Sequence, residues 1–262
     1  MRRILPILLA TALATAFRPA PACAEDLGRI DGLWVMKKAE DRYEGDDLFE
    51  DLHLELNYTG PKKAAKPRVM EVKWLRKEYG RDKKVVIHFT EPKAVNGVTL
   101  NTVIKPYQDD DRWLYVPEIK GIRRVAAKDE FSNFMGTDFT YFDLSEREPD
   151  EESHKLLGME DLDGHPCYLV ETTPKELRFG SYSKRLTWVD KDRFVKLRIQ
   201  YWDMGGRFLK QYDTADWTKI DDVWTAGKLT MTDRLREHKT EITRSNTRYN
   251  GNVPDEWLAP SS

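Results

Sequence analysis

The sequence predicts a mainly β fold, and three observations support this prediction. From residue 52 onward, apolar residues recur at every second position, which is the spacing of a strand with one buried face. Gly, Pro and Asp cluster between these runs, where strands must turn. Charged residues make up 34% of the chain, yet it also holds 8 Trp, 11 Tyr and 10 Phe. This combination suits a sheet with one polar face and one face lined by aromatic rings.

The first half of the predicted domain begins with a short helix and continues with strands. Apolar residues fall at helical spacing across residues 26–38, so one amphipathic helix is expected there. Alternating strands are then expected over residues 52–58, 70–75 and 85–89. A lysine-rich loop separates the first two strands, and Pro92 ends the third because proline cannot donate to a ladder.

In the second half the sequence predicts a hairpin followed by a meander of adjacent antiparallel strands. Asp163-Gly164 is a strong hairpin signal between residues 154–161 and 167–173. The later strands are expected over residues 185–189, 195–201, 207–217, 223–232 and 239–249. Residues 146–152 are the best candidate for a linker between the halves, and a solvated loop is an equally good interpretation. A final helical turn is expected at residues 253–258.

The N-terminus has the pattern of a secretory signal peptide. Two arginines precede an apolar run over residues 4–17, and Ala22-Cys23-Ala24 has the small residues of a cleavage site. The run is shorter than the roughly 20 residues that span a bilayer. We therefore expect a cleaved signal peptide (residues 1–24) and a single exported domain (residues 25–262).

Cleavage changes the cysteine count and the charge. It would leave Cys167 as the only cysteine, so no intramolecular disulfide could form. Loss of Arg2, Arg3 and Arg18 would take the formal net charge from −2 to about −5. This charge, and the lack of a basic groove with interleaved aromatic residues, argue against a nucleic-acid partner.

The sequence contains no recognised catalytic or metal-binding motif. None of the five histidines is paired at the spacing of a helical metal site. His165 and Cys167 come closest to a ligand pair, but two ligands beside Pro166 are weak support for a metal. Nucleophile elbows, phosphate-binding loops and dinucleotide fingerprints are also missing. We therefore expect a protein that is not an enzyme and that uses no metal or cofactor.

One central segment is unusual. Residues 111–125 combine Trp113-Leu114-Tyr115 with Arg123-Arg124, and four aromatic residues follow between positions 131 and 141, interrupted by Gly136. A glycine-hinged aromatic loop suits a segment that covers something. The alternative is a loop that plugs one end of the sheet.

These segments resemble a known family. Together with residues 186–191, 212–224 and 253–257, they are similar to the outer-membrane lipoprotein-sorting (LolA-like) family, specifically the periplasmic branch often found beside resistance-nodulation-division exporters. The resemblance implies a half-open antiparallel β-barrel of about 10–11 strands, wrapped around short helices and containing an apolar cavity that shields lipid. The chain is longer than the dedicated lipoprotein carrier and differs in its central motif, so a free lipid is as plausible a cargo as a lipoprotein.

From the strand pattern and the resemblance we expect an aromatic-lined cavity. The expected lining residues are Trp74, Phe89, Trp113, Tyr115, Trp188, Tyr201 and Trp224, with Phe134, Phe139 and Tyr141 as a lid. Arg123 and Arg124 are candidates for contact with an anionic head group or an acidic patch of a partner. The alternatives are ordinary core packing for the aromatic residues and simple solvent exposure for the two arginines.

Two hypotheses for function follow. The first is a monomeric periplasmic carrier of lipid or lipoprotein acyl chains, with an inner-membrane exporter complex and an outer-membrane acceptor as candidate partners. Because each buried CH₂ gains roughly 0.8 kcal/mol, a lipid needs an apolar shelter to cross an aqueous compartment. The second is a periplasmic lipid-sensing or adaptor module that docks on a membrane exporter or regulator.

Overall fold

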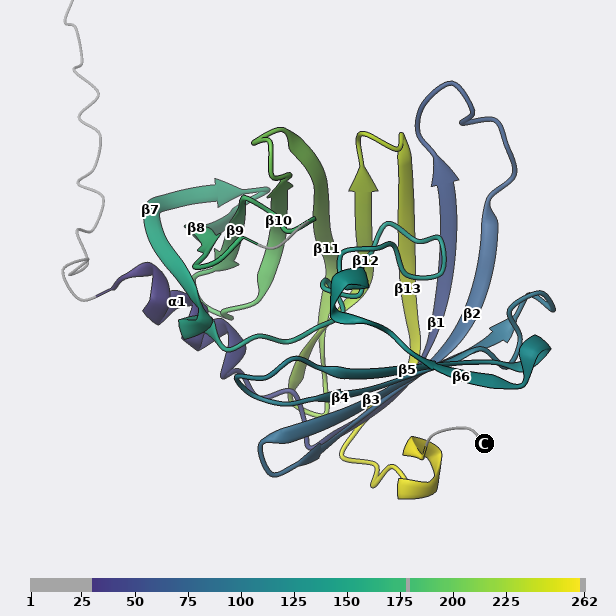
Figure 1. Cartoon of the computed structure of the whole chain (residues 1–262). Helices are drawn as coiled ribbons and strands as arrows, with labels where there is room; N and C mark the ends of the chain where they lie inside the picture. Colours follow the sequence, from purple (N-terminus) through teal and green to yellow (C-terminus); the bar gives the residue numbers. More distant parts are fainter. Residues whose placement is uncertain (1–29, 178–179, 260–262) are drawn as a thin grey trace, which may run out of the picture.

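The structure is a computed structural model that describes residues 30–177 and 180–259. The predicted signal peptide and its cleavage site lie outside these residues. The described chain is mainly β: 13 strands form one antiparallel sheet that curves strongly and does not close (Figure 1). The predicted fold class, a half-open antiparallel barrel, is therefore confirmed.

The sheet consists of two meanders joined at one seam. In chain order the strands are β1 (Asp47–Tyr58), β2 (Arg68–Tyr79), β3 (Asp82–Glu91), β4 (Thr99–Ile104), β5 (Asp111–Val116), β6 (Gly121–Arg124), β7 (Glu152–Leu162), β8 (His165–Pro174), β9 (Lys184–Asp190), β10 (Lys196–Trp202), β11 (Phe208–Ile220), β12 (Val223–Asp233) and β13 (His238–Tyr249). In space the order is β6-β5-β4-β3-β2-β1-β13-β12-β11-β10-β9-β8-β7. Every neighbouring pair is consecutive in sequence except β1 and β13, so this pair unites the two halves.

The helical elements are short. They are α1 (Gly32–Glu40) and the 3₁₀ turns η1 (Pro117–Ile119), η2 (Ala127–Asp129), η3 (Pro149–Glu151) and η4 (Asp255–Leu258). Helix α1 begins after Asp31, whose carboxylate accepts a hydrogen bond from the backbone N–H of Trp34 at 2.7 Å. It overlaps the predicted helix at residues 26–38, and η4 lies within the predicted final turn. No helix among the described residues is long and apolar enough to cross a membrane.

The Asp163-Gly164 turn joins β7 to β8 as predicted. Both residues have positive φ, at 55° and 87°, which a two-residue type I′ hairpin requires. Strands β4, β5 and β6 lie outside the expected strand ranges, and the observed 13 strands exceed the 10–11 that the resemblance implied. In β4 three polar residues, Thr99, Asn101 and Thr102, are buried beside apolar ones, which obscures the alternation.

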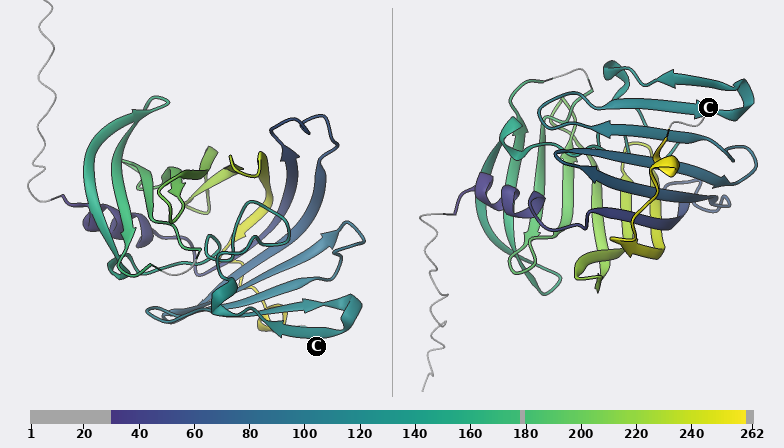
Figure 2. Two further views of the ribbon diagram at one scale, coloured as in Figure 1. Left: turned by 45° about the horizontal axis from the view of Figure 1, so that its top comes forward. Right: turned by 90° about the horizontal axis from the view of Figure 1, so that it is seen from below.

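The two faces of the sheet are covered differently. Residues 125–151, named here the plug segment, connect β6 to β7 by crossing the concave face (Figures 1 and 2). The C-terminal turn η4 instead lies outside the sheet, where Leu258 packs with Leu75 and Val86. The concave face with its plug segment is therefore the interior of the molecule.

Candidate functional site

The plug segment packs tightly over one half of the concave face. The ring of Phe134 lies 5.7 Å from that of Phe89 on β3 and 5.4 Å from that of Tyr141, measured between centroids. Phe89 is fully buried, and Leu100 of β4 and Leu114 of β5 belong to the same cluster. This half, named here the plugged half, is therefore a solid core.

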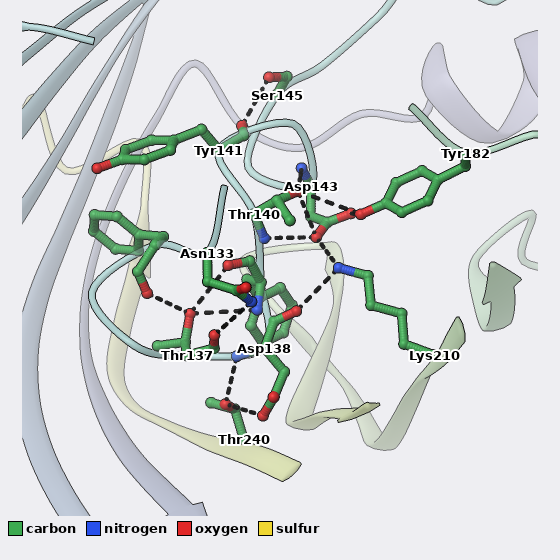
Figure 3. Close-up of polar contacts among 12 residues, drawn as sticks. Asn133, Thr137, Asp138, Thr140, Tyr141, Asp143, Ser145, Tyr182, Lys210 and Thr240 are labelled. Atoms are coloured by element: carbon green, nitrogen blue, oxygen red, sulfur yellow. Dashed lines mark hydrogen bonds and ion pairs between the residues drawn. The ribbon is translucent and has the colours of Figure 1, made fainter. Parts of the chain in front are cut away.

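A first buried carboxylate fixes the tip of the plug segment (Figure 3). Asp138 is 0% exposed, and its carboxylate accepts hydrogen bonds from Thr240 Oγ1 at 2.7 Å and Arg236 Nη1 at 3.0 Å. His238 Nδ1 lies 2.8 Å from the same carboxylate. These partners belong to β13 and to the β12–β13 loop, so Asp138 ties the plug segment to the sheet.

A second buried carboxylate fixes the middle of the plug segment. Lys210 on β11 is 2% exposed, and its Nζ donates to Asp143 Oδ2 at 2.5 Å and to the Asp138 carbonyl at 3.0 Å (Figure 3). The hydroxyl of Tyr182 donates to Asp143 Oδ1 at 2.9 Å. Burial raises the pKa of Tyr182 well above its ordinary value, so this hydroxyl keeps its proton.

The other half of the concave face holds an apolar cavity of about 360 Å³. Its apolar and aromatic lining residues include Leu48, Leu52, Trp74, Phe139, Leu144, Ile199, Tyr201, Tyr212, Trp217, Trp224, Ala226, Leu229, Met231 and Ile242. The volume falls within the range of about 300–1,000 Å³ that is typical of small-molecule sites. We call this region the open half.

Charged side chains interrupt the apolar wall of the cavity, and one ion pair among them joins β1 to β13. Glu50 Oε2 lies 3.5 Å from Arg244 Nε and accepts a hydrogen bond from Thr247 Oγ1 at 3.2 Å. Burial raises the pKa of Glu50, and the attraction of Arg244 offsets this only in part. The cavity lining also includes other charged side chains, namely Glu40, Arg42, Glu44, Arg76, Asp143, Glu146 and Lys196. The open half thus combines an apolar wall with a charged border.

A larger cavity of about 740 Å³ adjoins the apolar one. The larger one is lined mainly by charged and polar side chains. The residues that line both cavities are Glu40, Glu44, Asp143, Ser145, Glu146, Lys196, Ile199 and Tyr201. Glu146 pairs there with Lys83, and burial raises the pKa of Glu146. An amphiphile could therefore place its apolar part in the smaller cavity and its polar part in the larger one.

The structure separates the predicted lining residues into groups. Trp74, Phe139, Tyr201 and Trp224 line the apolar cavity. Three others, Phe89, Phe134 and Tyr141, belong to the core of the plugged half. The cavity therefore receives only one of the three residues expected in the lid.

The remaining predicted residues lie elsewhere. Trp113 and Tyr115 alternate with Leu114, which faces the interior, so they project from the convex face. Trp188 packs with Cys167 and Leu169 in a separate cluster. On β6, Arg123 is exposed. Its neighbour Arg124 borders the larger cavity and donates to Asp111 Oδ1 at 2.5 Å.

Sequence reasoning missed the polar groups of the site. Asp143 and Lys210 are 67 positions apart, and no local pattern links them. Tyr212 and Trp217 lay in a predicted strand, but the alternation alone did not show which face they occupy. The Glu50–Arg244 pair crosses the β1–β13 seam, which sequence order does not reveal.

Metal-binding and thiol groups are limited among the described residues. Within residues 30–177 and 180–259, no group of three or more His, Cys, Asp or Glu side chains is arranged to hold a metal ion. Cys167 is buried, and burial raises the pKa of its thiol to about 11, so the reactive thiolate is scarce at neutral pH. What the site offers is a sheltered apolar volume.

Comparison with known proteins gives a consistent result. A family model described as "-like: Uncharacterized protein" matches residues 81–261. No curated protein matches the sequence. A DUF1329 family protein from Desulfovibrio piger has 28% sequence identity and a TM-score of 0.81, over 87% of this chain and 95% of that chain.

Two further solved structures share the fold. A domain named as an outer membrane lipoprotein-sorting protein, from Vibrio parahaemolyticus, has 24% identity and a TM-score of 0.80 over 87% of this chain and 95% of that one. A LolA superfamily protein from Nitrosomonas europaea has 19% identity and a TM-score of 0.67 over 88% and 98%. The chain therefore belongs to the family that the matching model describes, and it shares its fold with a LolA superfamily protein.

Proposed function

We propose that this protein is a periplasmic carrier that shelters lipid, or the acyl chains of lipoproteins, and moves them between the inner and outer membranes. The observation that carries the proposal is the apolar cavity of about 360 Å³ inside a curved sheet. The fold shared with the Vibrio parahaemolyticus lipoprotein-sorting domain supports the cargo class. The signal-peptide pattern supports the compartment.

The plug segment forms part of the wall of the cavity. Phe139 and Leu144 of this segment form part of the cavity wall and lie close in sequence to the anchors Asp138 and Asp143. The anchors hold these side chains in place, so we expect the plug segment to remain in position when cargo binds. We therefore expect cargo entry from the larger polar cavity, with the polar end of the cargo remaining there.

A cavity-filling variant tests the proposal. Ala226 is 2% exposed and lines the cavity, so Ala226→Phe should lower the uptake of a fluorescent fatty acid at least about tenfold. Ala215→Phe makes the same change at an exposed position of β11 and should leave uptake unchanged.

Native mass spectrometry of protein purified without detergent should also detect bound lipid. The proposal is wrong if the wild-type protein takes up no amphiphile. It is equally wrong if Ala226→Phe, shown to be folded by circular dichroism, takes up as much as the wild type.

A further inference from the structure

The order of the strands separates the loops into two ends. Because all neighbours are antiparallel, the β1–β2, β3–β4, β5–β6, β8–β9, β10–β11 and β12–β13 connections share one end of the sheet. The remaining turns share the other end. Figure 1 shows the β1–β2 and β12–β13 loops together at the top of the view.

Three segments at the first end form one surface. The backbone N–H of Thr59 donates to the Glu237 carbonyl at 2.7 Å, which joins the β1–β2 loop to the β12–β13 loop. Arg68 donates to the Met135 carbonyl at 3.2 Å and Arg236 to that of Gly136 at 3.3 Å, which adds the tip of the plug segment. We call the surface formed by residues 58–69, 135–136 and 234–237 the basic rim.

The basic rim carries positive charge that the protein does not neutralise. Lys62, Lys63 and Lys66 are exposed, and none of them makes an ion pair with a described residue. Arg234 is also exposed, and its guanidinium lies 5.0 Å from the centre of the Phe208 ring. Glu237 is the only acidic residue of the rim. An anionic surface is therefore the complementary partner.

The basic rim also exposes apolar side chains among its cations. Leu235 is 54% exposed between Arg234 and Arg236, and Tyr58 and Val69 are 43% and 39% exposed. Cations next to exposed apolar residues are typical of surfaces that bind the interface of an anionic bilayer. On such a surface the cations would contact the lipid phosphates and the apolar side chains would enter the acyl boundary.

The opposite end of the sheet has a different character. Its turns carry the exposed residues Asp163, Asp221 and Asp222 together with the cations Arg81 and Arg193, so both signs of charge are present there.

We propose that the basic rim docks this protein on an anionic phospholipid surface. Docking needs no cargo in the cavity, so this proposal stands apart from the carrier function. It also adds a connection: Arg236 of the rim donates to Asp138, the anchor of the plug segment. The docking surface and the covered interior are thus in direct contact.

Vesicle flotation with the full chain tests the proposal. The protein should bind vesicles of phosphatidylglycerol and phosphatidylcholine but not vesicles of phosphatidylcholine alone, and added salt should weaken binding. The triple variant Lys62→Gln, Lys63→Gln, Lys66→Gln should lower the partition coefficient about 100-fold, since each cation near such a surface contributes about 1 kcal/mol.

The matched control removes the same charge elsewhere. Lys37→Gln, Lys155→Gln, Lys219→Gln changes three exposed lysines outside the rim and should bind as the wild type does. Ala226→Phe should also bind normally, which separates docking from cargo uptake. Equal loss in both triple variants would overturn the proposal, as would a wild-type protein that ignores anionic vesicles or binds only an acidic protein.

Discussion

The two halves of the concave face share one sheet but have different roles. In the plugged half, Phe134 and Tyr141 fill the space above Phe89, and the result is a close-packed core. In the open half, Trp74 and Leu229 face a cavity instead. The difference depends on where the plug segment reaches, which teaches that an apolar strand face alone does not define a binding site.

The largest loss of stability is expected from a substitution in the plugged half. Phe134→Ala removes a ring that is 4% exposed and packed against two others, so it should lower the free energy of unfolding by about 3–5 kcal/mol. Denaturant unfolding measures this change. A loss below about 1 kcal/mol would mean that the plugged half is not a true core.

Breaking the Lys210–Asp143 ion pair, which lies between the two halves, should lower the free energy of unfolding nearly as much. Lys210→Met leaves the Asp143 carboxylate buried without its cation, at an expected cost of about 3 kcal/mol. Lys228→Met, which breaks an exposed pair with Glu241, should cost less than about 1 kcal/mol in the same assay. Equal costs for the two variants would show that the Asp143 anchor has no special role.

Shortening a side chain in the open half should lower the free energy of unfolding by less. Leu229 already borders an empty volume, so Leu229→Ala should cost about 2 kcal/mol, at the low end for such a change. The variant should bind longer or bulkier fatty acids more tightly than the wild type, as fluorescence displacement would show. Unchanged ligand preference would place the cargo outside this cavity.

The sequence predicted the scaffold better than the site, for a physical reason. Alternation marks a strand with one buried face, as at Leu52, Leu54 and Leu56, but it does not say which face of a curved sheet encloses the interior. Trp113 and Tyr115 alternate with Leu114 just as cavity residues would, yet they lie on the convex face. A wide aromatic surface is therefore ambiguous until the sheet order is known.

Contacts between distant segments were beyond sequence reasoning. The plug segment was correctly recognised as unusual from its aromatic residues and Gly136, whose φ of 82° suits glycine. Its anchors depend on Lys210 and Thr240, which come from the other half of the chain. Only the β1–β13 seam brings those strands beneath the segment.

The smallest expected effect is the pH dependence of the open half. Burial raises the pKa of Glu50, so the folded protein holds this proton more tightly than the unfolded chain does. Glu50 therefore makes the free energy of unfolding fall as the pH rises above about 4.5, until the raised pKa is passed. One titrating group limits this slope to about 1.4 kcal/mol per pH unit.

Glu50→Gln should remove that slope, and denaturation midpoints across a pH series would measure the difference. Glu118→Gln, at an exposed position of η1, is the control and should leave the slope in place. If Glu50→Gln follows the wild-type profile, the Glu50–Arg244 pair is already solvated. The open half would then be a wet cleft, and its contrast with the plugged half would lie in hydration more than in shape.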